Sequence, residues 1–277
     1  MIMRRLLIAF TLSVLTQAAF AWGGFEHSVI AYMAQEHLTE NAIRNIRYYL
    51  DQPIYEYAEW MDYEPVQYSE ELGGLTRHSH LFTVNPDYTY AAGSLCNNGE
   101  CHGAPTMEMM LDALKAHKDM PDSTVILYLR CVIHLFGDFH CPCHIMSHHT
   151  PGGMEPDGSW RNHYMWKRCT YKGQKSSFHS LWDSALLRER PEWTYEDWRI
   201  YLDTWTEDEV NAVVEGGFRE WLVDSAVSSA PSFDWWTPGG AYDETFYTGK
   251  VADLAHVLIA KAAYRLAEQL NEIFDYE

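Results

Sequence analysis

The sequence predicts an all-α protein, because helical periodicity recurs along the chain and strand patterns are few. Residues 26–38, 106–118 and 250–273 repeat apolar side chains at the three- and four-residue spacing of a helix that packs one face onto a core. Extended segments are expected only at 81–90 and 164–171. Helices therefore carry the predicted fold.

One predicted helix is apolar on nearly every side. Pro121, Asp122 and Ser123 form a helix-start signal, and the apolar run that follows extends to Asp138. Such a helix is expected in the core of a larger domain. Pro142 should end it, since proline lacks the backbone donor that a helix needs.

Residues 177–190 and 206–229 also look helical, and Thr39 and Asn41 suit a turn and a new helix start. The sequence contains no Gly/Ser-rich linker, no low-complexity block and no internal repeat. These features predict a single compact multi-helix domain.

Residues 1–21 are expected to be a signal peptide. Two arginines form a short positive region, residues 6–17 form an apolar core, and Ala19-Phe20-Ala21 supplies the small-x-small pattern that signal peptidase reads. A membrane anchor is the alternative, but the apolar stretch is short for a bilayer and no stop-transfer pattern follows it.

Cleavage at this point leaves a mature domain of residues 22–277 that begins with Trp22. The expected location is secreted or periplasmic, with no stable membrane association after cleavage and a monomer favoured. Cysteines outside the cytosol tend to be oxidised. Cys96 and Cys101 bracket a turn-rich loop, which predicts a local disulfide.

The remaining cysteines are Cys131, Cys141, Cys143 and Cys169, which allow three pairings that the sequence does not distinguish. Cys141-Pro142-Cys143-His144 is one residue short of the C-x-x-C-H spacing for haem attachment, so haem is excluded.

The formal net charge is -19, which argues against broad electrostatic binding of nucleic acid. Bound metal ions would offset this charge locally. A group of basic residues also interrupts the acidic chain, and either a solvated loop or phosphate contact explains it. Its members are Arg161, Lys167, Arg168, Lys172 and Lys175.

Two His/Asp pairs have the spacing of neighbours on one helix face. His134 and Asp138 lie four residues apart in the buried helix, and His179 and Asp183 repeat the arrangement. One such pair is typically a hydrogen bond in a protein core. Two pairs without a thiolate pattern favour a zinc site of a hydrolase, since a buried carboxylate needs a partner or a metal.

The motifs resemble those of the zinc-dependent single-strand nucleases (the S-one/P-one family). The mature chain would begin W-x-x-x-x-H and later carries AEWMD, HLF, IHLFGDFHCPCH and SFHSLWDS. Its end, KAAYRLAEQLNEIF, is similar to the closing A-G-x-R-L-A-x-x-L-N helix of that family. The resemblance covers the mature chain in order. It implies a helical fold of the phospholipase C and nuclease type with a trinuclear zinc cleft.

The resemblance also implies a ligand set for three zinc ions. One zinc would be held by Asp62, His80, His134 and Asp138. A second would be held by His144, His179 and Asp183. The third would take His27, Asp138 as a bridge, and the α-amino and carbonyl groups of Trp22. His78 is an alternative to His80, although the HLF motif follows His80.

The implied activity is hydrolysis of single-stranded RNA or DNA to 5′-nucleotides, with 3′-nucleotidase activity. Zinc-bound hydroxide would attack phosphorus, and a further zinc would stabilise the leaving 3′ oxygen. Asp62 would be the catalytic residue that orients the hydroxide. The alternatives are a secreted zinc phospholipase C and a non-catalytic zinc-binding protein.

Two segments depart from the family pattern. Where the family has Asp-Arg-Gly-Gly-Asn, this chain has Arg161 to Met165. Where the family has an aromatic residue and an Asp that hold a base, this chain has Leu81 and Thr83, with Phe82 close by. The metal ligands therefore match the family better than the base pocket does.

Overall fold

The computed structural model of the chain describes residues 22–62, 80–85, 87–91, 103–146, 168–237, 239–247 and 249–277. It confirms the all-α fold class. The helices are α1 (Gly24–Glu36), α2 (Glu40–Tyr49), α5 (Gly103–Lys115), α6 (Asp122–Asp138), α8 (Phe178–Trp182), α9 (Ala185–Glu189), α10 (Tyr195–Leu202), α11 (Glu207–Val214), α12 (Phe218–Ser229) and α13 (Lys250–Phe274).

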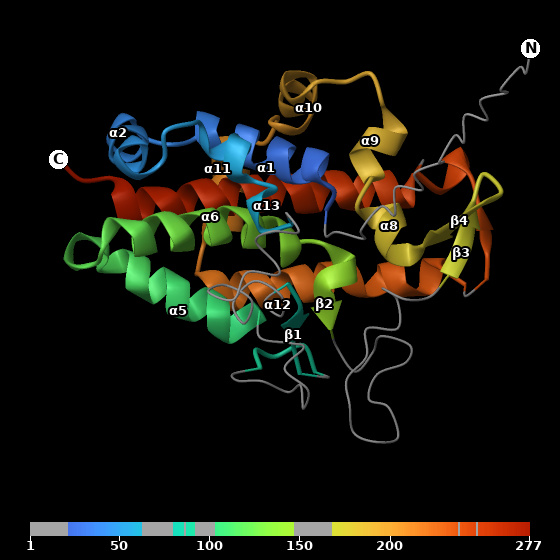
Figure 1. Cartoon of the computed structure of the whole chain (residues 1–277). Helices are drawn as coiled ribbons and strands as arrows, with labels where there is room; N and C mark the ends of the chain where they lie inside the picture. Colours follow the sequence, from blue (N-terminus) through green and yellow to red (C-terminus); the bar gives the residue numbers. More distant parts are fainter. Residues whose placement is uncertain are drawn as a thin grey trace, which may run out of the picture.

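The long helix α13 runs through the molecule, and α1 and α6 lie beside it (Figure 1). α1 also packs against α10, while α6 packs against α5. Apolar side chains from these helices form one core, to which α13 contributes a continuous row from Val251 to Phe274. This packing places the C-terminal half of α6, which is buried on all sides, next to the start of α1.

The strands are short. β1 (Phe82–Thr83) pairs in parallel with β2 (Ile145–Met146), which joins the segment before α5 to the end of α6. β3 (Arg168–Tyr171) and β4 (Gln174–Ser177) form an antiparallel hairpin, and β5 (Ala241–Tyr242) pairs in parallel with β3. The expected extended segments thus contain strands, although 81–90 holds only β1 and a bridge between Val84 and Tyr90.

Predicted helix starts agree with the observed caps. Thr39 caps α2, because its hydroxyl oxygen accepts a hydrogen bond from the backbone of Ala42 at 3.1 Å. The segment 206–229 is helical as expected, but it holds two helices, because the chain breaks between α11 and α12. Gly216 has a φ of 93° there, a conformation that a helix does not contain.

The segment 177–190 is also helical but divided, because α8 ends at Trp182 and α9 begins at Ala185. The backbone amides of Leu186 and Leu187 donate instead to Oε1 of Glu26, at 3.0 and 3.2 Å. A carboxylate from α1 therefore replaces helix carbonyls as the acceptor at this break.

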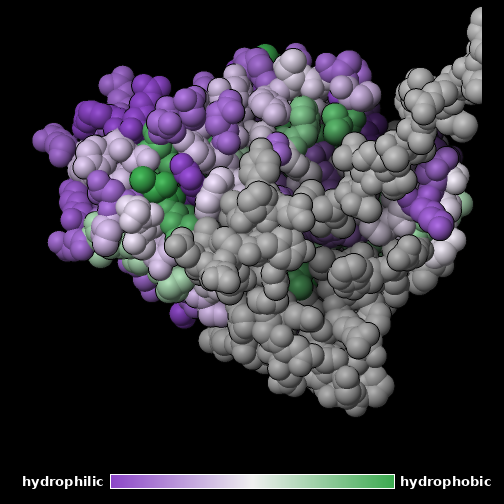
Figure 2. Space-filling model, viewed as in Figure 1, coloured by the Kyte–Doolittle hydropathy of each residue, from purple (hydrophilic) through white to green (hydrophobic). Residues whose placement is uncertain are grey.

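None of the helices in the described parts of the chain is both long enough and apolar enough to cross a membrane. On the face shown in Figure 2, hydrophilic residues predominate over α2 and α10. This agrees with the large excess of acidic residues in the sequence.

Candidate metal centre

The residues that the sequence predicts as ligands converge in the core from segments far apart in the chain. His27 comes from α1, Asp62 from the end of a short 3-10 helix (Trp60–Asp62), and His134 and Asp138 from α6. His80 precedes β1, and His144 ends a second 3-10 helix (Pro142–His144). The members buried from solvent are Trp22, His27, Asp62, His134, Asp138, His144, His179 and Asp183.

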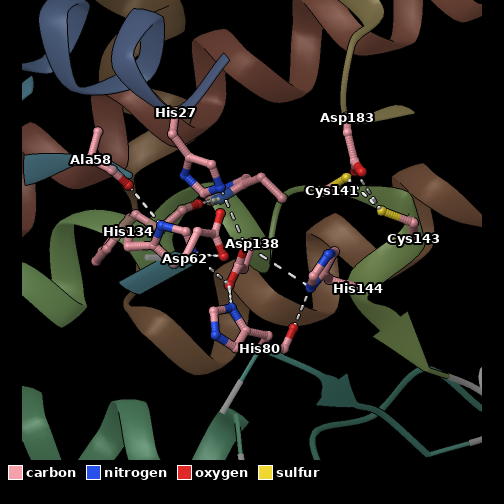
Figure 3. A network of polar contacts seen from close by, with 12 residues as sticks. His27, Ala58, Asp62, His80, His134, Asp138, Cys141, Cys143, His144 and Asp183 are labelled. Carbon is pink, nitrogen blue, oxygen red and sulfur yellow. Dashed lines mark hydrogen bonds and ion pairs between the residues drawn. The ribbon is translucent and has the colours of Figure 1, made fainter. Parts of the chain in front are cut away.

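Asp138 lies at the centre of this set (Figure 3). Its Oδ2 is 2.8 Å from Nδ1 of His80 and 3.4 Å from Nε2 of His134. Its Oδ1 is 3.4 Å from Nε2 of His27 and 4.0 Å from Nδ1 of His144. One carboxylate thus faces four imidazole rings, an arrangement suited to bridging two ions.

Backbone carbonyls orient two of the rings. Nδ1 of His134 donates to the carbonyl oxygen of Ala58 at 2.7 Å, and Nδ1 of His144 donates to the carbonyl oxygen of His80. A histidine that donates from one ring nitrogen presents a lone pair on the other. The Nε2 atoms of His134 and His144 can therefore act as ligands when these rings are neutral.

A second group lies beside the first. Nε2 of His144 is 3.0 Å from Nε2 of His179, and Nδ1 of His179 is 3.2 Å from Oδ2 of Asp183. Helical spacing explains the second contact, since His179 and Asp183 are one turn apart. His144 faces Asp138 on one side and this group on the other.

Trp22 is fixed by its side chain and by its neighbour. Its indole ring is buried and lies edge-on to Trp182, with ring centroids 6.2 Å apart. The backbone amide of Gly23 donates to the carbonyl oxygen of Asp183 at 2.5 Å. The start of the described chain is therefore attached to the segment that carries Asp183.

Several buried polar atoms of this set have no hydrogen-bond partner among the described residues. They are Nδ1 and Nε2 of His27, Oδ2 of Asp62, Nε2 of His80, Nε2 of His134, Oδ1 of Asp138 and Nδ1 of His179. Buried polar atoms are normally satisfied, and leaving one without a partner costs about 1–3 kcal/mol. Imidazole and carboxylate donors suit zinc, so these residues fit divalent ions.

The pKa values of the histidines in the centre differ from one another. Burial and the neighbouring His134 lower the pKa of His27 to about 3, so its ring is neutral and can donate a lone pair. Burial also lowers the pKa of His179, as does His144. Burial acts to lower the pKa of His134, but the carboxylates of Asp138 and Asp62 outweigh this effect and raise the pKa to about 9.

The carboxylates also differ from one another. Burial raises the pKa of Asp62 to about 6, and it raises the pKa of Asp183 well above the usual range. Burial acts upward on Asp138 too, but His134, His144 and His80 outweigh it and hold its pKa well below the usual range. Of these three carboxyl groups, Asp138 is therefore the one held most strongly in its charged form.

Sequence reasoning missed two positions that shape the centre. Glu26 is buried beside His27, where burial raises its pKa to about 8. Gly137 leaves room for the His27 ring, because a Cβ atom at Gly137 would overlap that ring. A glutamate within an apolar helix and a glycine within the buried run of α6 were the signals available in the sequence.

Four of the six cysteines lie in the described parts of the chain. These four form no disulfide with one another; Sγ of Cys141 and Sγ of Cys143 are 3.1 Å apart, a hydrogen-bond contact. Cys169 is on β3 and Cys131 is in α6. The expected disulfide between Cys96 and Cys101 lies outside the described residues.

Phe82 lies in the hydrophobic core. It is fully buried, and its ring packs against Phe139 and Phe218. Thr83 is buried as well. The segment from Arg161 to Met165, together with His78, lies outside the described residues.

Fold and centre together define an all-α protein whose core gathers imidazole and carboxylate groups suited to divalent metal ions. A sequence model of the S1/P1 nuclease family matches residues 22–275, and the chain belongs to this family. Nuclease S1 of Aspergillus oryzae (strain ATCC 42149 / RIB 40) is 23% identical over 291 aligned positions, which cover 94% of each protein. Family membership places the chain among hydrolases that act on phosphodiester bonds.

Proposed function

We propose that the mature chain is a zinc-dependent nuclease that cleaves single-stranded RNA or DNA to 5′-nucleotides and also acts on 3′-nucleotides. The observation that carries the proposal is the position of Asp138, whose two carboxylate oxygens face the rings of His27, His80, His134 and His144. Membership of a nuclease family supports a phosphodiester substrate.

The ligand groups proposed for three zinc ions follow the sequence expectation. Asp62, His80, His134 and Asp138 would hold one ion, and His144, His179 and Asp183 a second. His27, Asp138 and the backbone of Trp22 would hold the third. The close approach of ligand atoms within His80/His134/Asp138 supports the first ion, and that within His144/His179/Asp183 supports the second.

Zinc ions in such a centre supply Lewis acidity, which lowers the pKa of water and stabilises negative charge on phosphate oxygens. Asp62 is the residue of this chain best suited to orient an attacking water. Its Oδ1 lies 3.7 Å from Nε2 of His134, while Oδ2 has no hydrogen-bond partner among the described residues. A carboxyl group whose pKa burial raises to about 6 can accept a proton near neutral pH.

Secretion follows from the same proposal. Residues 1–21 would be removed as a signal peptide, and the family match beginning at residue 22 supports this boundary. Removal would give Trp22 a free α-amino group, which can bind a metal ion only after cleavage. The ring of Trp22 is already held in the core, so little backbone ordering remains when the amine binds.

The deciding experiment offers the zinc-loaded protein starting at Trp22 four substrates: single-stranded RNA, single-stranded DNA, a 3′-mononucleotide and phosphatidylcholine. Hydrolysis of the nucleic acids to products with 5′-phosphates is the expected result. Asp62→Asn should lose at least about 10²-fold in rate. Asp208→Asn, which changes an exposed carboxylate of α11, is the matched control and should keep the wild-type rate.

Turnover of phosphatidylcholine alone would replace the nuclease with a phospholipase C. Zinc binding without turnover of any substrate would leave a non-catalytic metal-binding protein. Either result would overturn the proposed function.

A further inference from the structure

Two cysteines lie next to the second ligand group without a role in the proposed function. Cys141 and Cys143 flank Pro142 directly before His144, and both are fully buried. Their sulfur atoms are 3.1 Å apart, and Sγ of Cys143 lies 3.7 Å from Oδ1 of Asp183. Figure 3 shows both sulfur atoms close to the Asp183 carboxylate.

The position of Cys143 matches that of a ligand. One donor atom from each of Cys143, His144, His179 and Asp183 lies within 4.8 Å of all the others. Donor atoms around a tetrahedral zinc ion are roughly 3–4 Å apart, because the bonds to nitrogen, oxygen and sulfur measure about 2.0–2.3 Å. Two contacts in this group agree with that spacing: Nε2 of His144 is 3.0 Å from Nε2 of His179, and Sγ of Cys143 is 3.7 Å from Oδ1 of Asp183.

Hydrogen bonding within the group leaves one ring nitrogen of His179 without a partner among the described residues. His144 donates from Nδ1 to the carbonyl oxygen of His80, so its Nε2 presents a lone pair to His179. If Nε2 of His179 donates to it, Nδ1 of His179 becomes an acceptor. That buried atom has no hydrogen-bond partner in the described parts of the chain and faces the carboxylate of Asp183. A buried ring nitrogen is normally satisfied, and a metal ion can satisfy one that has no hydrogen-bond partner.

We propose that Cys143, as a thiolate, is the fourth protein ligand of the metal ion bound by His144, His179 and Asp183. This inference rests on the proposed function for the existence of that ion. On binding, the sulfur–hydrogen bond of Cys143 breaks, the proton passes to solvent, and the sulfur lone pair forms the bond to the metal. No electrons are transferred, so no oxidant or reductant is needed.

Cys141 acts as a positioning residue for this ligand. With its sulfur 3.1 Å from that of Cys143, its S–H donates to the thiolate and stabilises the charge. Pro142 fixes the backbone between the two cysteines, because its ring restricts φ. A soft thiolate next to two imidazoles favours zinc or cobalt over magnesium or calcium, and so restricts which ion this group accepts.

The test uses cobalt(II) as the probe in the protein that starts at Trp22. A thiolate bound to cobalt produces an intense near-ultraviolet charge-transfer band, which nitrogen and oxygen ligands do not produce. We expect the band in the wild type and in the control variant Cys131→Ala, which removes a buried cysteine of α6 outside the ligand groups. Cys143→Ala should lose the band, and one zinc ion should bind at least about tenfold more weakly in a chelator competition.

The variant Cys141→Ala distinguishes the roles of the two sulfur atoms. It should retain the band, because only the hydrogen bond to the thiolate is removed. Peptide mapping of the metal-loaded, unreduced protein after denaturation and alkylation should find alkyl groups on both Cys141 and Cys143.

Cobalt binding without the band in the wild type would overturn the thiolate ligand but leave the His/Asp centre in place. A band that persists in Cys143→Ala, or a disulfide between Cys141 and Cys143 in the loaded protein, would also overturn it. Absence of any bound metal would overturn the proposed function as well. Because the wild-type spectrum and the mapping need no variant, they test the thiolate ligand even where Cys143→Ala misfolds.

Discussion

The imidazole ring of His27 lies directly against the backbone of Gly137. A Cβ atom at Gly137 would overlap the ring, which also stacks on the ring of His134 with centroids 4.0 Å apart. Two residues of α6 therefore position His27, the proposed ligand from α1. Gly137 leaves space for its ring, and His134 stacks on it. Gly137 provides room for a side chain of another helix rather than backbone flexibility.

We expect Gly137→Ala to be destabilising, although alanine normally stabilises a helix interior by about 1 kcal/mol relative to glycine. The added methyl group must displace the His27 ring, and overpacking of a core typically costs about 1–3 kcal/mol. Urea unfolding and metal analysis would measure the loss. Gly217→Ala is the control, since its methyl group would meet only Glu220 at 3.8 Å. Unchanged stability and metal content in Gly137→Ala would contradict the prediction.

We expect Glu26→Ala to lower the free energy of unfolding, although Glu26 is not one of the proposed ligands. It leaves the buried amide of Leu186 and the partly buried amide of Leu187 without their acceptor, at a cost of about 1–3 kcal/mol, and loosens the segment that follows Asp183. Glu26→Gln retains the acceptor oxygen. Because burial raises the pKa of Glu26 to about 8, the native group is neutral at pH 7 and glutamine resembles it closely. Unfolding free energies that are equally low in both variants would argue against this role.

The ion pairs of Asp224 predict a loss of stability in acid. Burial acts to raise the pKa of Asp224, but hydrogen bonds from Lys261 and Arg265, both 2.7 Å from Oδ2, outweigh it and lower the pKa. A carboxylate with a lowered pKa stabilises the fold above its unfolded value, about 3.9, and this contribution disappears as pH falls through the folded value.

Asp224→Asn should therefore be less stable than the wild type at neutral pH, and the difference should shrink as the solution is acidified below about pH 4. Denaturant unfolding at several pH values measures it. The control Glu268→Gln changes an exposed carboxylate of α13, the helix that carries Lys261 and Arg265. A difference between Asp224→Asn and wild type that does not depend on pH would rule out this explanation.

Removal of metal should destabilise the protein. Without ions, Asp138 and the imidazoles around it are buried with several polar atoms lacking hydrogen bonds among the described residues. Ions that bind only the folded state add about 2.7 kcal/mol at a concentration one hundred times the dissociation constant. Thermal unfolding after chelation, and again with added zinc, tests this. A melting temperature insensitive to both treatments is the opposing outcome.

One extra residue before Trp22 should reduce the zinc content. A peptide bond at this position removes the α-amine that is proposed to bind the third ion, while the buried indole ring keeps its place against Trp182. Native mass spectrometry would compare the chain that starts at Trp22 with one that starts at Ala21. We expect one zinc fewer and most activity lost in the longer form; equal zinc content would exclude the amine as a ligand.

Helix existence was largely predictable, whereas helix breaks were not. The predictions over 26–38, 106–118 and 250–273 agree with α1, α5 and α13 to within a few residues, because periodicity reports which face a helix buries. The break between α8 and α9 depends on Glu26, which lies far away in the sequence. Local propensity contains no information about such an acceptor.

The order of residues along the chain was enough to predict the helical class and the types and spacing of the candidate ligands. Periodicity and the four-residue separation of His134 from Asp138 are local properties of a helix. Three further features became visible only in the folded chain: four imidazoles face the single carboxylate of Asp138, Gly137 leaves space for His27, and Cys143 lies beside Asp183. Those contacts join segments far apart in the sequence, so they depend on how α1, α6 and α8 pack together.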